Sequence, residues 1–334
     1  MSRLGGLVAL LLMVVFGFAV YVALGHTKRA VASTVTVKPP RTIPFTLPGT
    51  IVIASAGQLY QLQGGTFKAI GSGGAWSSPA LTPDGQHIVA VKRGFNYSNL
   101  YLLGADGTVQ RQLTNNQSRA AVAFNLWAFY PRVSVDGKTI VFSSDKGKNP
   151  YVYTVDLSVW SMPVGGGAAQ KWSQPSPGTG GDVEPAPLAN GGVIYTKFGL
   201  DPAGLNVSTI VLKSHPYGPE VALTQPGQHC QQPVLNADGT RIAAVCQVSA
   251  RVDAVEVWQF DGQQLVGGPL VVFQSGLAAT PAWSPDGTGL IFLAPGANDA
   301  AGNFQLWYSP LYGKPKQLTT GSDFDAQSAP AWKA

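Results

Sequence analysis

The chain has 334 residues, of which 45% are hydrophobic and only 12% are charged, and it contains 40 glycines and 25 prolines. This composition is too apolar for a disordered protein, and abundant glycine and proline with few charges indicate short strands joined by turns. The net charge of +5 is modest, and the lysines and arginines form no cluster, which disfavours nucleic-acid binding.

Residues 1–29 are predicted to form a signal-anchor transmembrane segment. Leu7 to Leu24 is an uncharged apolar run, long enough to cross a bilayer as a helix. A cleaved signal peptide is the alternative, because the AVA sequence at 30–32 fits the small-residue cleavage pattern, although Lys28 and Arg29 precede it. Anchoring leaves the protein in the cell membrane, whereas cleavage makes it a secreted protein.

Residues 30–49 are predicted to be a linker between the membrane and the rest of the chain. They contain four prolines and no periodic hydrophobic pattern. Proline keeps such a stretch extended, as a semi-rigid spacer of about 3 Å per residue.

From residue 50 onward one unit repeats. Copies begin around SSPALTPDG (77–85), and a marker proline recurs every 48 to 54 residues. The marker prolines are Pro79, Pro131, Pro185, Pro233, Pro281 and Pro330. Each copy predicts a β-hairpin, in which Asp-Gly or Gly-Gly makes the tight turn before a Val- and Ile-rich strand. A second hairpin follows most copies, and four strands in about 50 residues are typical of a β-propeller blade.

The two ends of the repeat region complete each other. TIVIAS at 50–55 matches internal second strands but has no first strand before it, and SAPAW at 328–332 is a first strand without a second. Together they supply one blade, which leaves no unpaired sheet edge where the ring closes. The sequence therefore predicts an all-β, six-bladed propeller over residues 50–334, preceded by the transmembrane helix.

The repeat resembles that of the TolB-like six-bladed propellers, a WD-like pattern of proline, aromatic, Ser-Pro-Asp-Gly and an apolar strand. Trp283-Ser284-Pro285-Asp286-Gly287 matches this motif in full, and the 79–85 and 131–137 copies match in part. The resemblance implies the fold and a place outside the cytoplasm, periplasmic or extracellular. TolB carries a further α/β domain ahead of its propeller, which this chain replaces with the anchor and linker, so a Tol–Pal role is not expected.

Cys230 and Cys246 flank one predicted hairpin. If Asn236 and Thr240 close its turn, each cysteine lies six residues from its turn residue, and the two face each other across the strands. Directly opposed residues come close enough for a disulfide. Two free buried thiols are the alternative. A disulfide requires an oxidising compartment, which agrees with export of the propeller.

No catalytic motif is present, and no metal or other cofactor is predicted. The sequence lacks HExxH, GxSxG and a Walker loop. The recurrent Asp84, Asp136, Asp238 and Asp286 are interpreted as turn residues. A metal-dependent lactonase- or lyase-like hydrolase remains the alternative, for which the inner strands offer mainly Asp182 and Glu184 as channel carboxylates.

Binding is predicted on the face of the propeller that carries the long loops. Loops positioned by a rigid scaffold commonly carry function. These loops contain aromatic and charged side chains that contact surfaces favour: Arg93, Phe95, Tyr97, Arg119, Phe124, Trp127, Tyr130, Lys148, Tyr151, Arg251 and Asp325. The sequence thus predicts a monomeric, non-catalytic binding or scaffolding module, whose partner is a protein, a peptide or a cell-envelope glycan.

Overall fold

The computed structural model describes residues 40–42, 47–152, 154–297 and 299–334. The apolar run Leu7–Leu24 lies outside these residues. Within them, no helix is both long and apolar enough to cross a membrane.

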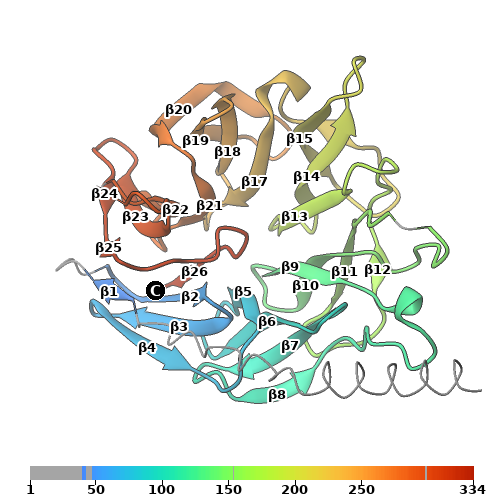
Figure 1. The fold of residues 1–334 in the computed structure, drawn as a ribbon. Coiled ribbons are helices and arrows are strands. Elements are labelled where there is room, and N and C mark those ends of the chain that lie inside the picture. Colours follow the sequence, from blue (N-terminus) through green and yellow to red (C-terminus); the bar gives the residue numbers. More distant parts are fainter. Residues whose placement is uncertain (1–39, 43–46, 153, 298) are drawn as a thin grey trace, which may run out of the picture. The chain divides into compact units, whose positions relative to one another are not determined.

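Six four-stranded antiparallel sheets form a ring (Figure 1). From the inner strand outward, the first three blades are blade 1 with β5 (Trp76–Leu81), β6 (His87–Arg93), β7 (Ser98–Gly104) and β8 (Val109–Gln112); blade 2 with β9 (Ala128–Val133), β10 (Thr139–Ser144), β11 (Ser158–Pro163) and β12 (Gln170–Lys171); and blade 3 with β13 (Asp182–Pro187), β14 (Val193–Leu200), β15 (Asn206–Lys213) and β16 (Val221–Ala222).

The remaining blades complete the ring. They are blade 4 with β17 (Cys230–Leu235), β18 (Arg241–Ser249), β19 (Val252–Phe260) and β20 (Leu265–Gly276); blade 5 with β21 (Ala279–Trp283), β22 (Gly289–Pro295), β23 (Phe304–Pro310) and β24 (Lys316–Gln317); and blade 6 with β26 (Ala331–Lys333), β2 (Thr50–Ser55), β3 (Gln58–Gln63) and β4 (Thr66–Ile70). Two 3-10 helices, η1 (Val122–Phe124) and η2 (Pro226–Gln228), lie in connections.

The predicted closure is confirmed. Strand β26 pairs with β2 through Thr50↔Lys333, Ile51↔Trp332 and Val52↔Ala331. The inner strand of blade 6 therefore comes from the C-terminal end of the chain and its outer strands from residues 50–70. The closing pairs satisfy the edge of β2 that would otherwise be open.

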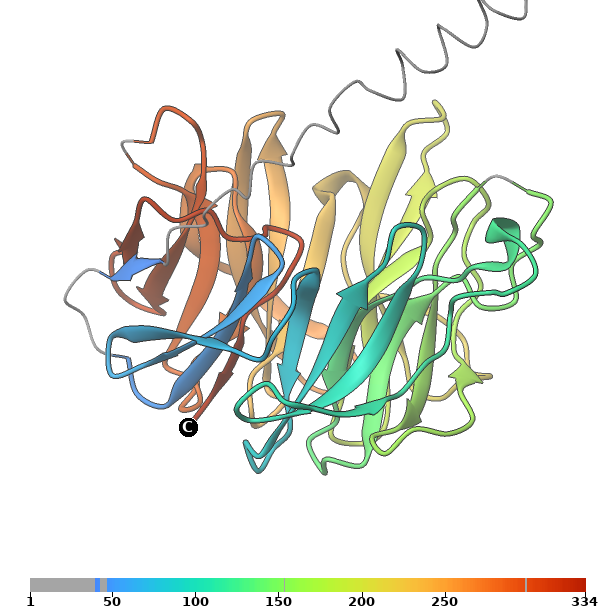
Figure 2. The same cartoon turned by 60° about the horizontal axis from the view of Figure 1, so that its bottom comes forward.

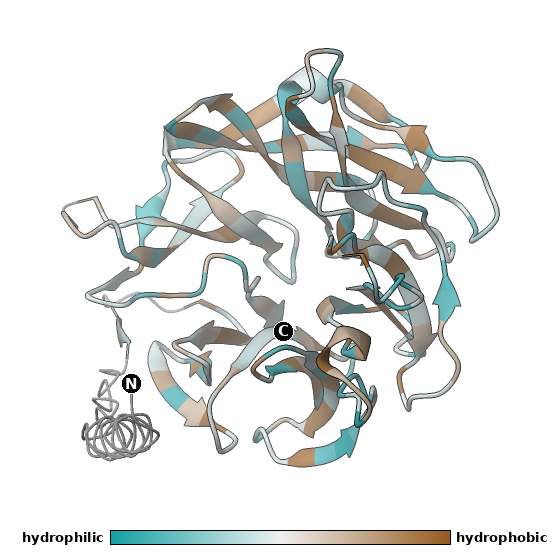
Figure 3. Ribbon diagram, turned by 45° about the vertical axis from the view of Figure 1, so that its right-hand side comes forward, coloured by the Kyte–Doolittle hydropathy of each residue, from teal (hydrophilic) through white to brown (hydrophobic). Residues whose placement is uncertain are grey.

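The hydrophobic core lies between neighbouring blades. Hydrophobic and hydrophilic residues are mixed along the strands (Figure 3), and six clusters of buried side chains each join two adjacent sheets. Between blades 1 and 2, for example, Val89, Val91 and Leu100 pack against Ile140 and Phe142. Burying one such side chain contributes about 1.5–3 kcal/mol, so the ring is stabilised by every blade-to-blade contact.

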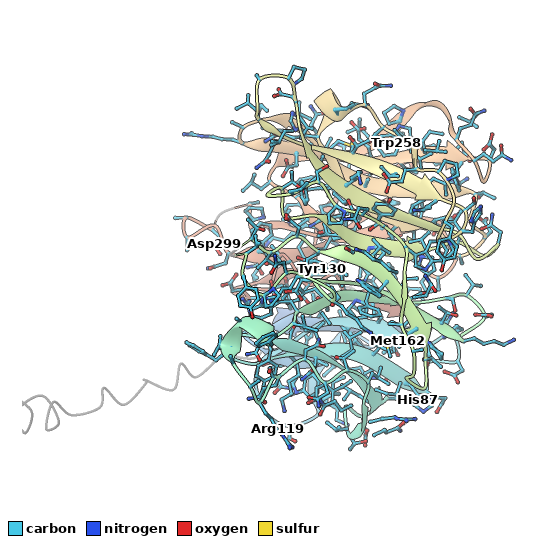
Figure 4. All side chains as sticks on the ribbon, turned by 90° about the vertical axis from the view of Figure 1, so that its right-hand side faces the viewer. His87, Arg119, Tyr130, Met162, Trp258 and Asp299 are labelled. Atoms are coloured by element: carbon cyan, nitrogen blue, oxygen red, sulfur yellow. A yellow bond between two sulfur atoms is a disulfide. The ribbon has the colours of Figure 1, made fainter. Side chains whose placement is uncertain are left out.

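The two ends of the ring differ. We call the end with the Asp-Gly turns the turn face, and the end with the long connections the loop face. Figure 2 shows the ring from the side, with the C-terminus at the turn face. In Figure 4, Arg119 and Asp299 of the long loops lie on one side and His87, next to an Asp-Gly turn, on the other. The predicted separation of long and short connections is therefore confirmed.

The recurrent aspartates are turn residues, as the sequence predicts. The Asp286 carboxylate accepts hydrogen bonds from Ser284 Oγ and from Thr288 N and Oγ1. These hydrogen bonds lower the pKa of Asp286, and Asp84 has the same arrangement with Thr82 and Gln86. Each carboxylate holds its own turn closed.

Part of the predicted linker is attached to the propeller. Strand β1 (Arg41–Thr42) pairs with β25 (Thr319–Thr320), which immediately precedes the loop 321–327. Leu47 is buried in the core cluster shared by blades 5 and 6. The repeat pattern does not predict this pairing, because neither short strand belongs to a blade. The pairing satisfies backbone N–H and C=O groups that would otherwise be open along the edge of β25.

Cys230 and Cys246 lie opposite each other in the register of β17 and β18 and are joined by a disulfide. The predicted hairpin register is thereby confirmed. The bond ties the inner strand of blade 4 to its neighbour near the loop face.

Candidate functional site

The same β-bulge recurs in the inner strands of five blades and shapes the central channel. In five blades the residue before the marker proline has a positive φ of 47° to 59°, and the pairing register shifts there. These residues are Ser78, Tyr130, Glu184, Gln232 and Thr280. A left-handed conformation is unfavourable for non-glycine residues and indicates that the surroundings impose it. All five line a small central pocket.

The bulge side chains join neighbouring blades around this pocket. Thr280 N donates to Gln232 Oε1 at 2.5 Å, and Gln232 N donates to Glu184 Oε2 at 3.0 Å. Ser78 N donates to Ser328 Oγ at 2.6 Å. A side chain of one blade thus accepts a hydrogen bond from the backbone N–H of the bulge in the next blade. These hydrogen bonds give the polar side chains of the channel a structural role.

Glu184 and Tyr130 are the titratable groups of this ring. Burial raises the pKa of the Glu184 carboxyl, against the hydrogen bonds from Thr196 and Gln232 and the charge of Arg132. Burial also raises the pKa of Tyr130 well above its usual value, with further contributions from the charges of Glu184 and Asp325. Tyr130 therefore remains a hydrogen-bond donor at any physiological pH.

The second carboxylate suggested for a channel enzyme has a different network. Asp182 pairs with Lys197 at 3.3 Å, Lys197 pairs with Glu220 at 3.1 Å, and Tyr195 Oη donates to Glu220 Oε1 at 2.8 Å. Asp182 and Glu184 therefore have separate hydrogen-bond partners. In the described part of the chain, no group of three or more His, Cys, Asp or Glu could hold a metal ion.

A stack of side chains leads from the loop face to the channel. The Arg93 guanidinium lies over the Trp127 ring, with its Cζ 5.4 Å from the ring centroid. Trp127 stacks on Phe129 at 5.5 Å, and Phe129 lies 5.8 Å from Tyr130. We call these four residues the aromatic stack. Cation–π and aromatic contacts of this kind hold their members in a fixed geometry.

Asp145 holds the base of the stack. Its buried carboxylate accepts a hydrogen bond from Trp127 N at 2.6 Å and pairs with Lys148 at 2.8 Å. Strand β10 ends at the preceding residue, Ser144, so blade 2 itself positions the loop that carries Trp127. The stack is therefore built in advance of any binding event.

Several predicted residues are exposed on the connections of blades 1 and 2. Phe95 is 99% exposed, Tyr151 80% and Phe124 46%. Phe124 ends η1, which Figure 3 shows as a hydrophobic coil. Exposed aromatic side chains gathered on one face are typical of an interaction surface.

The other predicted residues are distributed more widely. Arg119 is exposed in the connection between blades 1 and 2, and Asp325 is exposed at the channel mouth, where its charge reaches Tyr130. Tyr97 folds back over Gly94 within its own turn. Arg251 lies at the tip of the β18–β19 hairpin in blade 4, away from blades 1 and 2 that carry the stack.

Sequence reasoning missed Phe129 and Asp145. Phe129 lies between two predicted residues, and its place within the strand concealed it. Asp145 was part of a polar stretch after β10, and only the fold shows that its carboxylate reaches Trp127 N. An aspartate directly at the end of a buried strand was the available signal.

Comparison with known proteins agrees with this fold. The chain is similar to TolB from Acinetobacter baumannii, with a TM-score of 0.66, 21% identity, and coverage of 87% of this chain and 68% of that one. It is also similar to a putative TolB from Agrobacterium tumefaciens, with a TM-score of 0.58, 15% identity and coverage of 82% and 91%.

A third similar structure is a gluconolactonase from Xanthomonas campestris, with a TM-score of 0.52, 16% identity and coverage of 78% and 81%. No protein-family model matches the chain, and no curated protein matches it in sequence. The fold is that of a TolB-like propeller. At these identities the similarity concerns the fold alone, so function must be argued from the site.

Proposed function

We propose that the protein is a non-catalytic binding module, tethered to a membrane outside the cytoplasm, whose loop face binds a protein partner. The aromatic stack is the observation that supports this proposal. Trp and Arg are among the residues most enriched at positions that dominate binding energies, and here they are already ordered on the face whose loops also carry the exposed Phe95 and Tyr151.

The charges around the stack indicate the chemistry of the partner. Arg93, a member of the stack at the end of β6, and Arg119, in the connection between blades 1 and 2, are both exposed, and Lys146 extends over the Trp160 ring of β11. The nearby carboxylate of Asp145 is already paired with Lys148. A partner segment with acidic residues beside apolar ones would complement this surface.

The path of the chain supports a membrane-proximal role. Strand β1 pairs with β25 at Thr319, whose Oγ1 contacts Gln305 at the start of β23, at the loop-face end of blade 5. Strand β1 therefore lies at the loop-face end of blade 5. A membrane anchor at Leu7–Leu24, as the sequence predicts, favours a partner that is itself in or near the membrane.

The experiment is affinity capture from envelope extracts with the full-length chain, followed by mass spectrometry and measurement of binding to the captured protein. Trp127→Ala and Arg119→Ala should together weaken binding by about 2 kcal/mol or more if the stack is the centre of the interface. The matched controls Asp84→Lys and Asp286→Lys alter the turn face and should leave affinity unchanged.

Some results would overturn the proposal. Loss of binding in the turn-face variants alone would mean that the interface lies on the turn face and not on the loop face. Capture of glycan strands instead of protein would change the class of partner. Circular dichroism of each variant distinguishes lost binding from lost folding.

The enzyme alternative is tested separately. A hydrolase in the channel would depend on Glu184, whose raised pKa makes it the strongest candidate there for a general acid or base. Turnover of lactones by the wild type, abolished in Glu184→Gln, would favour the enzyme, whereas no turnover in either protein would favour the binding module.

A further inference from the structure

A second candidate site lies at the other end of the channel. The turn face contains a cavity of about 340 Å³, a volume within the range of small-molecule sites. All six blades contribute to its wall, mostly with apolar groups such as Leu81, Val133 and Trp283. Trp283 and Trp332 direct their indole N–H groups to backbone carbonyls, so their rings are fixed in place.

One position of the repeat is different in blade 2 alone. The residue after the marker proline lines this cavity in every blade. In blade 2 it is Arg132, whereas the other blades have small apolar residues, namely Ala80, Ala186, Val234, Ala282 and Ala331. Because five blades build the same strand with alanine or valine, the fold does not require arginine here.

The Arg132 guanidinium has unused hydrogen-bonding capacity. Among the described residues, its Nη1 donates to the neighbouring Pro131 carbonyl alone, at a long 3.4 Å. None of the ion pairs found among the described residues includes it. Glu184 acts on it only at longer range, and burial lowers the pKa of Arg132. A guanidinium carries five donors, and leaving such a charge partly desolvated and unpaired is unfavourable.

The polar groups around Arg132 are already engaged. Ser134 Oγ and Ser284 Oγ donate to turn aspartates, and Asn236 bonds to Arg241 N. Among the described residues that line the cavity there is no acidic side chain, and the other charged side chain is a second cation, Lys333, next to Ala334, which also lines it. The cavity thus combines apolar walls with the buried guanidinium of Arg132.

We propose that the turn-face cavity binds a carboxylate attached to a small apolar body, with Arg132 holding the carboxylate through two parallel hydrogen bonds. Guanidinium and carboxylate match in this bidentate geometry. The carboxylate can belong to a free small acid or to the terminal residue of a peptide. The site is separate from the loop face, so it adds a second binding activity to the molecule.

The test uses the full-length chain in a non-ionic detergent with 4-phenylbutyrate as the probe. Trp283 and Trp332 line the cavity and report binding by their fluorescence. We expect saturable binding with a dissociation constant of about 1 mM or below, and none with the neutral 4-phenylbutanamide. Arg132→Ala should weaken binding about tenfold or more, because a charge-assisted pair is lost.

Controls separate the site from the fold and from the loop face. Arg132→Ala introduces the residue that four other blades use at this position, so it should fold normally. Arg132→Lys keeps the charge but loses the fork, and its affinity should lie between those of the wild type and Arg132→Ala. Arg119→Ala, on the loop face, should bind the probe like the wild type.

A second arm identifies the source of the carboxylate. A tetrapeptide ending in phenylalanine is compared with the same peptide amidated at its C-terminus. Binding of either phenylbutyrate or the free-acid peptide, dependent on Arg132, supports the proposal. Equal binding to the wild type and Arg132→Ala, absence of binding by both acids, or stronger binding of phenyl phosphate than of phenylbutyrate would overturn it.

Discussion

Removing Ala331–Ala334 should destabilise the propeller by about 5 kcal/mol, because these residues contain the inner strand of blade 6. Strand β26 pairs with β2 at three positions. Antiparallel pairs alternate between two hydrogen bonds and none, so at about 1 kcal/mol per net hydrogen bond this pairing contributes about 3 kcal/mol. The Trp332 indole donates to the Pro48 carbonyl at 2.8 Å, and its ring meets Tyr308 edge-on at 6.2 Å. These two contacts add about 1 kcal/mol each.

The assay is urea unfolding of the full-length and truncated chains, followed by circular dichroism. A loss of about 5 kcal/mol approaches the whole stability of a marginal domain, so the truncated chain should unfold at much lower urea or fail to close. Removal of Ala334 alone is the matched control, since this residue lies beyond β26. If the truncated chain and the control unfold at the same urea concentration, the closing strand does not stabilise the ring and the reasoning is wrong.

Three further predictions concern single contacts. Replacing Cys230 and Cys246 with alanine should lower the free energy of unfolding by about 3 kcal/mol, as urea titration would show; an unchanged midpoint would contradict this. Lys197→Met should lower the free energy of unfolding by about 3 kcal/mol, because it leaves the Asp182 carboxylate buried without its cation. Thermal unfolding measures this loss, and a melting temperature equal to that of the wild type would refute the prediction. The raised pKa of Glu184 means that the folded state binds this proton more tightly than the unfolded state does. The contribution of Glu184 to the free energy of unfolding therefore grows as the pH falls through the raised pKa toward about 4.3. Urea titrations across pH should show that Glu184→Gln loses this gain, and identical pH profiles for the variant and the wild type would contradict the assignment.

The blades were predictable because each is defined locally. An Asp-Gly turn followed by a buried apolar strand occurs at nearly constant spacing, so TIVIAS at 50–55 could be matched to β2 and SAPAW at 328–332 to the segment that contains β26. The opposition of Cys230 and Cys246 followed from the same turn geometry. Short-range rules therefore determined the register without knowledge of the three-dimensional structure.

The candidate site was predictable only as a set of loops. Trp127, Tyr130 and Arg93 were identified as contact residues, but their stacking depends on Phe129 and on the Asp145 carboxylate, which come together only in the folded blade. The β1–β25 pairing has the same origin, since it joins residues far apart in the sequence. Contacts between elements have no local pattern that a sequence could display.

Comparing equivalent positions of the six blades separates residues needed for folding from residues available for function. A feature that recurs in most blades is explained by folding, as with the turn aspartates of four blades and the strained residue before the marker proline in five. Function should therefore be sought where one blade departs from the others at a position that the fold leaves unconstrained. Blade 2 does so with Arg132 at the floor of the turn-face cavity, two residues after Tyr130 at the inner end of the aromatic stack. Only Pro131 separates these residues, so the variants at Trp127 and Arg132 must each be measured with both ligands before either effect is assigned to its own site.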